Sequence, residues 1–553
     1  MKTREYFKSG EAWVWLNAGT VAISLIMVAG ILGLIAVRGL GHFWPADVMQ
    51  ASYSAPGSGS SEVLLGEIYD RKVDTAKRLQ EAGLQIPAGK ASIERISLKL
   101  GNRDLTGADF RWVFADGLSS IKYPTDIVTL ERYEWGNFYG RLQSVSENGA
   151  VVAQGKAAWD ALQTRIARSN DLLTQVADIE KGDIGSINFG IEKLRLQEKK
   201  LTLRNEMTPE AQAAISAERS TLDQRYAALA GKLDQIKQQS ARDSATFVTA
   251  QGNSLTIPLN KIVAATQPNN MNVFEKLGTY FHNLWQFLSG DPREANTEGG
   301  VFPAIFGTVM MVLMMTVMVT PLGVIAAIYL REYASQGAAT QIVRIAVNNL
   351  AGVPSIVYGV FGLGFFVYFL GGNIDRIFYP EAAPAPVFGT PGLLWASITL
   401  ALLTLPVVIV ATEEGLARIP RALKEGSLAL GATKAETLWR VVLPMATPSI
   451  MTGVILAIAR AAGEVAPLML VGVVKLAPTL PLDGNAPFLH LERKFMHLGF
   501  HIYDVGFQSP NVEAARPLVY ATALLLVTVV ATLNLSAVGL RNRLREKYKA
   551  LES

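Results

Sequence analysis

The chain has 553 residues, of which 50% are hydrophobic and only 18% are charged, and its formal net charge is +4. Soluble globular domains carry about 25% charged residues, and the deficit here is concentrated in long uncharged runs, so the composition excludes a soluble enzyme. The sequence contains no cysteine, which excludes disulfides, cysteine-ligated zinc, iron–sulfur clusters and a thiol nucleophile. The basic residues are dispersed or flank apolar segments and give no argument for nucleic-acid binding.

Six apolar segments are long enough to cross a membrane as helices. A membrane helix needs about 20 apolar residues, whereas the strands of a membrane β-barrel alternate over about ten residues, so these runs favour helices. The first run is too long for the core of a secretory signal, which is about 7–15 residues, and we expect it to be retained. The expected spans are Ala12–Val37, Phe302–Leu330, Ile345–Leu370, Leu393–Thr412, Thr447–Val474 and Pro517–Leu540.

Clusters of lysine and arginine give the expected orientation, because short loops rich in these residues stay in the cytoplasm. Lys2, Arg4 and Lys8 precede the first span, and further clusters lie at Arg418–Arg440 and Arg541–Lys549. We therefore expect both termini in the cytoplasm. The domain prediction is residues 1–40 for the N-terminus and helix 1, residues 41–300 for an extracytoplasmic insertion, and residues 301–553 for the core with helices 2–6 and a cytoplasmic loop at 413–444.

The insertion is expected to be an α+β domain. Ala91–Leu100 and Asp126–Glu134 alternate as strands do. Ala245–Ala250 and Ser254–Leu259 flank Gln251-Gly252-Asn253, which predicts a β-hairpin.

Within the insertion, about residues 156–243 predict an antiparallel coiled-coil hairpin. Apolar residues recur there at heptad spacing, and Thr208-Pro209 is a typical start for its second helix. The charges are balanced, as on a solvated spacer or a partner platform without chemistry. The two expected seams are Trp159, Leu162, Ile166, Leu173 and Val176, and Ile215, Leu222, Tyr226, Leu229, Leu233 and Ile236.

A further helix, about residues 272–288, is expected just before the second span. Its apolar residues fall at steps of three and four, and aromatic rings are frequent. This spacing favours an amphipathic helix in the membrane interface, and a packed core helix of the inserted domain fits it equally well. The residues concerned are Phe274, Leu277, Tyr280, Phe281, Leu284, Trp285, Phe287 and Leu288.

Two patterns resemble ligand sites without meeting their requirements. The segment Gly83–Ala91 resembles a phosphate-binding loop, but it has one residue too many and lacks the Ser or Thr after its lysine. We therefore expect any ATP to be bound by another subunit. His497 and His501, with His490 nearby, are expected on an amphipathic helix Phe488–Tyr503; no carboxylate stands at the spacing of a metal motif, so no metal site is predicted.

The most informative segment is Glu425–Pro444, EGSLALGATKAETLWRVVLP, between the fourth and fifth spans. Gly431 permits a backbone turn that a Cβ would hinder, and Pro444 suits the first turn of a helix. The segment closely resembles the EAA loop of the type I ABC importer permeases, with Gly-Ser in place of Ala-Ala and valine in place of isoleucine. The residues that match are Glu425, Gly426, Ser427, Gly431, Val441, Leu443 and Pro444.

This resemblance implies that the loop forms two short helices that dock on an ATPase subunit; an ordinary amphipathic loop is the alternative. Further segments resemble the phosphate-specific permeases of the family, including long forms with an extra N-terminal extracytoplasmic domain. The resemblance covers helix 1 and residues 291–553. It is carried by Asp291–Gly300, Pro321–Gly323, Ala351–Val357 and Ala457–Leu468.

Arg460 and Glu464 are four residues apart in an otherwise apolar span. Charges inside a membrane are costly and are usually paired and functional, and arginine suits bidentate contacts with phosphate oxygens. We expect Arg460 to contact the anion in the pathway and Glu464 to be its counter-ion when the pathway is empty. A permanent structural ion pair is the alternative.

The sequence therefore predicts a mainly α protein, a six-helix type I ABC importer permease with a large α+β insertion between helices 1 and 2. The resemblance implies a subunit of an ATP-driven phosphate importer in the bacterial inner membrane, with no enzyme activity or cofactor of its own. Its expected partners are a second homologous permease, an ABC ATPase dimer and an extracytoplasmic phosphate-binding protein. A permease for sulfate or molybdate and a membrane-anchored sensor are the alternatives.

Overall fold

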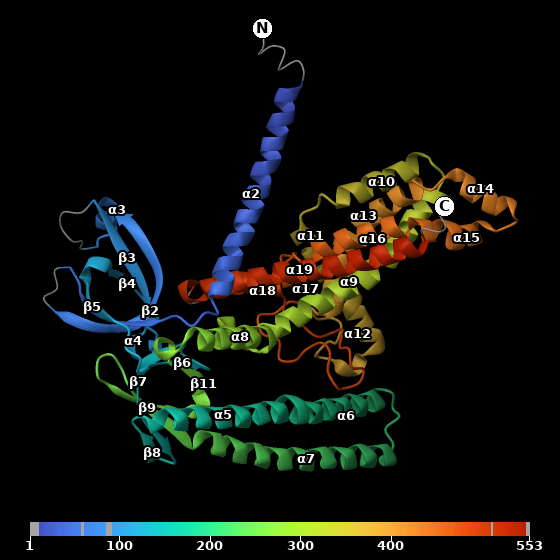
Figure 1. The fold of residues 1–553 in the computed structure, drawn as a ribbon. Helices are drawn as coiled ribbons and strands as arrows, with labels where there is room; N and C mark the ends of the chain where they lie inside the picture. Colours follow the sequence, from blue (N-terminus) through green and yellow to red (C-terminus); the bar gives the residue numbers. More distant parts are fainter. Residues whose placement is uncertain (1–9, 57–59, 85–90, 510–511, 549–553) are drawn as a thin grey trace, which may run out of the picture.

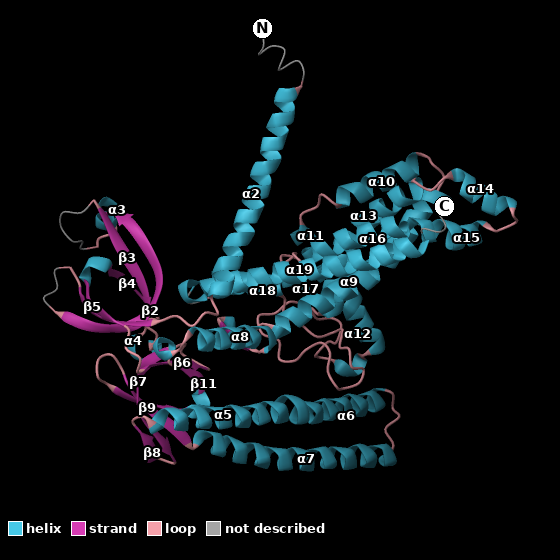
Figure 2. Cartoon of the chain, viewed as in Figure 1, coloured by secondary structure: helices cyan, strands magenta, loops and turns pink. Residues whose placement is uncertain are grey.

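The computed structural model describes residues 10–56, 60–84, 91–509 and 512–548. A helical bundle lies beside a domain built of β-sheets, and a long helical hairpin extends from that domain along the bundle (Figures 1 and 2). The basic residues Lys2, Arg4, Lys8 and Lys549, and residues 85–90 of the loop-like segment, lie outside the described residues.

The described residues contain six helices that are long and apolar enough to cross a membrane, as the sequence predicts. They are Trp13–Gly41, Phe302–Tyr333, Ser355–Phe378, Leu393–Ala417, Lys434–Ala461 and Ala515–Leu544. The elements that form them are α2 (Glu11–Gly41), α9 (Phe302–Ile328), α11 (Ser355–Phe361) through α12 (Gly372–Phe378), α13 (Leu393–Ala417), α15 (Lys434–Thr437) through α16 (Leu443–Ala461), and α19 (Val512–Tyr548).

The prediction of helix 3 over Ile345–Leu370 is wrong at its start. The uncharged run covers two helices, α10 (Ala338–Leu350) and α11, with a turn between them at residues 351–354. Pro354 disfavours the α conformation in the residue before it, and hydropathy does not mark such a turn. The membrane-spanning helix therefore begins at Ser355.

The prediction of helix 5 over Thr447–Val474 is also wrong at both ends. The helix begins at Lys434, because Thr433 and Glu436 form a capping box there, and it ends at Ala461. Beyond Ala461 the chain turns and then forms only the short α17 (Leu468–Val471). Arg460 consequently lies in the last turn of the helix and not in the middle of a span.

The centre of the bundle is α13, which packs against α9 and α16. Small residues allow this approach: a Cβ added at Gly323 of α9 would lie 2.6 Å from Val408 of α13, and one at Gly453 of α16 would lie 2.7 Å from Ala411. Membrane helices associate through such close packing, because lipid supplies no hydrophobic drive between them. The surrounding core includes Met311, Met315, Leu400, Leu403, Val454 and Ile458.

Helix α2 stands largely apart from the bundle and crosses α19 near one end (Figure 1). At the crossing Gly39 lies against the backbone of Tyr520, where an added Cβ would come within 2.9 Å. The apolar side chains from Trp13 to Val37 are exposed along the rest of α2. This helix therefore presents an apolar surface that lipid or another chain must cover.

The inserted domain contains two antiparallel sheets. The first has the strand order β4-β3-β2-β1-β5 and the second β10-β9-β7-β6-β11, with β8 on β7. The predicted strands are confirmed as β3 and β6, and the predicted hairpin as β9 and β10. The bounds are β1 Val48–Ser54, β2 Ser61–Thr75, β3 Ser92–Lys99, β4 Phe110–Phe114, β5 Leu118–Lys122, β6 Ile127–Arg132, β7 Phe138–Glu147, β8 Ala150–Gln154, β9 Asp243–Val248, β10 Ser254–Pro258 and β11 Ile262–Thr266.

The helical hairpin consists of α5 (Ala157–Ala177), a π-helical segment Asp178–Ile184, α6 (Gly185–Leu203) and the antiparallel α7 (Pro209–Ala241). Thr208 caps α7 as expected, accepting a hydrogen bond from the Ala211 amide at 3.1 Å.

The expected seam is only partly correct. Leu162 and Ile166 pack on the second sheet, Val176 meets Ile236 between the helices, and Tyr226 is exposed. Heptad spacing identifies a buried stripe, but it does not specify which neighbour covers that stripe.

Helix α8 (Val273–Ser289) has one apolar face that the protein leaves uncovered. Phe274, Phe281 and Trp285 are 84%, 62% and 67% exposed. On the opposite face Phe287 is buried and its ring lies 5.2 Å from that of Phe43. A core helix would bury both faces, so the exposed row favours an interfacial helix.

Candidate coupling loop and substrate pathway

The segment that resembles the EAA loop folds as a helical pair at one end of the bundle, remote from the sheets (Figure 1). α14 (Arg421–Ala429) ends in a turn at Gly431, whose φ of +89° is strained for any residue with a Cβ. α15 then starts at Lys434 with Thr433 as its N-cap, and the hydroxyls of Ser427 and Thr437 lie 2.9 Å apart, which closes the pair. The turn that the sequence predicts at Gly431 is therefore present.

Basic residues fix this pair to the end of the second span. Lys424 forms an ion pair with Glu332, and the Lys434 ammonium donates to the Glu332 backbone oxygen. The Lys434 ammonium also lies 4.4 Å from the centre of the Tyr333 ring. The helical pair therefore contacts the residues that follow α9 and leads directly into α16.

The tip of the pair exposes large apolar side chains. Leu430, next to Gly431, is 91% exposed, and Trp439 is 73% exposed. Leu423 and Leu428 are also exposed, and so are Glu425 and Gly426. Leu430 lies at the turn and Trp439 two residues beyond α15, so both ends of the second short helix carry a large apolar side chain that the described chain leaves uncovered.

Arg460 and Glu464 lie where α16 ends and the chain turns toward α17. The Arg460 Nε and Glu464 Oε1 atoms are 4.0 Å apart, with side chains 32% and 22% exposed. Among the described residues the Arg460 guanidinium forms no hydrogen bond, and its one ion pair is this contact with Glu464.

The structure also contains polar residues that the sequence analysis did not single out. Asp504 is buried and lies 3.1 Å from the ammonium of Lys475. On α13 the hydroxyls of Ser397, Thr399 and Thr412 are buried and have no hydrogen-bond partner among the described residues. Isolated Ser and Thr in an apolar helix give no periodic signal, and only packing shows that they are enclosed.

The histidines do not form the expected helix. α18 is only Leu498–Tyr503, and His497 precedes it as its N-cap, with its Nδ1 accepting from the Gly499 amide at 3.1 Å. Burial lowers the pKa of His497 to about 4. His490 lies apart, with its ring nitrogens 3.0 Å from Asp483 and 3.2 Å from Glu492. In the described part of the chain, no group of three or more possible ligands could hold a metal ion.

Six helices long and apolar enough to cross a membrane, with a pair of short helices at one end of the bundle, are the architecture of a multi-pass membrane protein. The model of the family "Binding-protein-dependent transport system inner membrane component" matches residues 319–549. The chain belongs to this family, the type I ABC importer permeases. Its matching relatives show further that it is a PstA-like permease of the cytoplasmic membrane.

One such relative is "Phosphate transport system permease protein PstA 1" of Mycobacterium tuberculosis, which is 38% identical over 248 residues, 44% of this chain and 71% of the relative. The PstA protein of Mycobacterium leprae is 37% identical over 44% of this chain and 71% of the relative. "Probable phosphate transport system permease protein PstA" of Methanocaldococcus jannaschii is 32% identical over 42% of this chain and 74% of the relative.

Among solved structures, the MetNI methionine ABC transporter matches with a TM-score of 0.31 and 19% identity, over 47% of this chain and 97% of that chain. A bacterial ABC transporter involved in the import of the acidic polysaccharide alginate matches with a TM-score of 0.31 and 14% identity, over 44% and 78%. Because these TM-scores and identities are low, residues of this chain cannot be matched to residues of either solved structure.

Proposed function

We propose that this chain is a permease subunit of an ATP-driven importer of inorganic phosphate. The observation that carries the proposal is the guanidinium of Arg460, paired only at 4.0 Å with Glu464, in a chain similar to permeases named for phosphate transport. Phosphate is strongly hydrated, and a pathway through the membrane needs a cation to replace that hydration. Arg460 would bind the anion bidentately, and Glu464, held only loosely at 4.0 Å, would neutralise Arg460 between transport events.

The helical pair around Gly431 would couple the chain to an ABC ATPase. Its exposed Leu430 and Trp439 supply an apolar contact, and its ion pair with Glu332 would pass motion to α9 as well as α16. ATP would be bound by that partner, and this chain would need no cofactor and perform no hydrolysis. Closure of the ATPase dimer would then switch the pathway between inward- and outward-facing states.

The remaining partners would be a second homologous permease and a phosphate-binding protein. The unpartnered apolar surface of α2 supports an assembly in which another membrane subunit covers part of this helix. The binding protein would dock on the side of the bundle that carries the sheets and the hairpin. That side would be extracytoplasmic and both termini cytoplasmic, because the basic clusters near Arg418–Arg440 and Arg541–Arg543 lie at the opposite ends of the spans.

Two other functions remain distinguishable by experiment. A permease for sulfate or molybdate would use the same arginine, because these oxyanions are also tetrahedral. A membrane-anchored sensor would need the hairpin but would not need Leu430 and Trp439 exposed around a capped helical pair.

The test is uptake of radiolabelled phosphate in cells that lack the chain and in cells that carry it with its partner subunits. We expect uptake to depend on the chain and to be unaffected by excess sulfate or molybdate. Competition by sulfate or molybdate would favour the other oxyanions, and an unchanged uptake together with no co-purifying ATPase would favour the sensor.

A further inference from the structure

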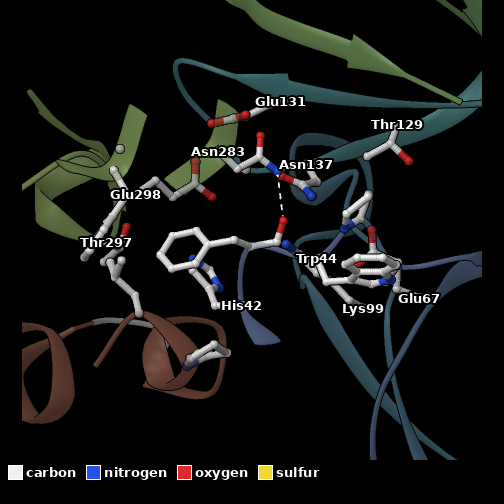
Figure 3. Close-up of a pocket in the computed structure, with 18 of the residues that line it drawn as sticks. His42, Trp44, Glu67, Lys99, Thr129, Glu131, Asn137, Asn283, Thr297 and Glu298 are labelled. Carbon is white, nitrogen blue, oxygen red and sulfur yellow. Dashed lines mark hydrogen bonds between the residues drawn. The ribbon is translucent and has the colours of Figure 1, made fainter. Parts of the chain in front are cut away.

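A cavity of about 1160 Å³ lies where the inserted domain meets α2, α8 and α19. Figure 3 shows residues that line it, among them His42, Glu67, Lys99 and Glu298. Arg460 and Glu464 are not part of its lining. The cavity is therefore separate from the proposed pathway, and the proposed transport function does not explain it.

Two arginines line the end of this cavity that faces the membrane helices. Arg38 is in the last turns of α2, and Arg516 is in the first turns of α19. Among the residues that the structure describes, neither guanidinium forms an ion pair with a carboxylate; Arg38 lies 5.6 Å from the ring centre of Tyr520. Neither guanidinium is therefore in direct contact with a carboxylate in the described part of the chain.

Tyr69 of β2 shows that the two arginines act on one place. Its hydroxyl donates to the Glu513 backbone oxygen of α19 at 2.7 Å, which ties the sheet to this helix. Burial raises the pKa of Tyr69 to about 12; the charges of Arg516 and Arg38 oppose that rise, and those of Asp70 and Glu513 add to it. Both arginines therefore lie near the same hydroxyl.

Four of the acidic residues of the lining have cationic partners of their own. Asp291 pairs with Lys181, Glu131 with Arg293, and Arg103 with both Asp109 and Glu294. Asp70 accepts a hydrogen bond from the Arg71 amide. Burial raises the pKa of Glu298 to about 7 and also raises the pKa of Glu67. The protonated form of Glu298 carries no charge and can donate a hydrogen bond to an anion.

Lys99 also lines the cavity, beside Glu67 (Figure 3). No ion pair of Lys99 occurs within the described residues. Apolar residues of the spans, Val37 and Leu518, line the cavity together with the arginines. An arginine in the terminal turn of a span lies at the depth of lipid headgroups.

We propose that this cavity binds a phosphate group, held by Arg38 and Arg516. The guanidinium fork matches two phosphate oxygens, which makes arginine the side chain best suited to this group. Both a glycerophospholipid headgroup and free inorganic phosphate carry the required chemistry. The apolar lining at the junction of α2 and α19 suits the glycerol and first methylenes of a lipid, and the volume exceeds what one phosphate ion needs.

The test uses the full-length protein purified in detergent, with the wild type compared with Arg38→Gln, Arg516→Gln and the double variant. Binding is measured by native mass spectrometry and by thermal shift with three probes: dioctanoyl phosphatidylglycerol, inorganic phosphate, and dioctanoylglycerol, which lacks phosphate. Arg71→Gln is the matched control, because Arg71 lies on the same strand as Tyr69, pairs with Glu94 at 3.4 Å, and is not in the cavity lining.

We expect the wild type and Arg71→Gln to bind at least one phosphate-bearing probe, and each cavity variant to bind it about tenfold more weakly, as the loss of a charged hydrogen bond predicts. Binding of the phospholipid alone identifies a lipid site, and binding of inorganic phosphate identifies a soluble anion site. The proposal is overturned if neither probe binds, if dioctanoylglycerol binds as well as the phospholipid, or if the variants, folded as shown by an unchanged melting temperature without probe, bind like the wild type.

Discussion

The ring of Phe189, on α6 of the helical hairpin, meets the ring of His490 edge to face, with 5.8 Å between their centres. These residues are far apart in the sequence, and the contact joins the inserted domain to the loop between α17 and α18. Two further contacts join the helical hairpin to the bundle. Lys181 pairs with Asp291 before α9, and Lys200 lies 3.8 Å from Glu381 in the connection between α12 and α13. The hairpin therefore touches the connections of three different parts of the bundle.

The first prediction concerns this hairpin. Replacing residues 181–232 with a short Gly–Ser turn removes all three contacts and keeps the packing of Val176 against Ile236 and of Leu162 on the sheet. We expect normal membrane levels and uptake within about twofold of the wild type, because exposed ion pairs contribute only about 0–1 kcal/mol.

The measurements are quantitative blotting of membranes and phosphate uptake over a range of concentrations. Phe189→Ala serves as the smaller variant. Normal levels with no uptake would show that the hairpin belongs to the transport mechanism, and a higher half-saturating concentration alone would indicate a role in docking the binding protein.

The second prediction concerns Arg460. Arg460→Gln should reduce phosphate uptake by about 10- to 100-fold, the range expected when a charged hydrogen bond is lost, while insertion and assembly stay normal. Arg460→Lys should recover little, because lysine lacks the planar fork. Uptake and co-purification of the ATPase are measured together.

Arg493→Gln is the control for a paired arginine, since Arg493 contacts Asp483 at 2.6 Å. Full transport by Arg460→Gln would contradict the pathway role and would mean that Arg460 and Glu464 form a purely structural ion pair.

The third prediction concerns Gly431. Its φ of +89° costs a residue with a Cβ about 1–2 kcal/mol, and Gly431→Asp would also place a charge beside the apolar tip. We expect ATP hydrolysis to continue in the assembled transporter while uptake falls several-fold. Gly337→Ala is the matched control in the other loop on this side, because its added Cβ would meet nothing within 4 Å.

Cross-linking tests the same surface directly. Cysteines at Ala432 or Thr433 should form cross-links to the ATPase, since the chain has no cysteine of its own. A cysteine at Ser335, in the loop between α9 and α10, is the comparison. Cross-links from Ser335→Cys and none from the Gly431 turn would show that the coupling element is the loop between α9 and α10.

The fourth prediction concerns pH. Burial lowers the pKa of His497 from 6.5 in the unfolded chain to about 4 in the folded protein. Between pH 6.5 and about pH 4, the unfolded chain therefore binds a proton at this residue and the folded protein does not. The stability from this residue is present above about pH 6.5 and is lost as the pH falls toward 4. Protonation would also remove the Nδ1 acceptor of the cap at Gly499.

His497→Asn keeps a capping acceptor and does not titrate. We expect the melting temperature to fall more for the wild type than for this variant when the pH is lowered from 7 to 5, with both proteins measured in the same detergent. Parallel pH curves for the two proteins would contradict the assignment of a buried neutral histidine.

The sequence by itself determined the features that depend on neighbouring residues. Six apolar runs are long enough to span a membrane, Thr208 caps the helix that follows it, and Gly431 permits a turn. Each of these depends on hydropathy, a side chain that reaches an adjacent amide, or the absence of a Cβ. Such short-range causes can be read from a few consecutive residues.

The tertiary structure decided what depends on residues far apart in the chain. It placed Arg460 in the last turn of α16, because the turn after Ala461 lies inside one apolar run and leaves no mark in hydropathy. It set Phe189 against His490 and gathered Arg38, Lys99 and Arg516 around one cavity. The packing of α2, α19 and the sheets brings these side chains together, and a periodic pattern specifies which face of an element is buried but not which partner buries it.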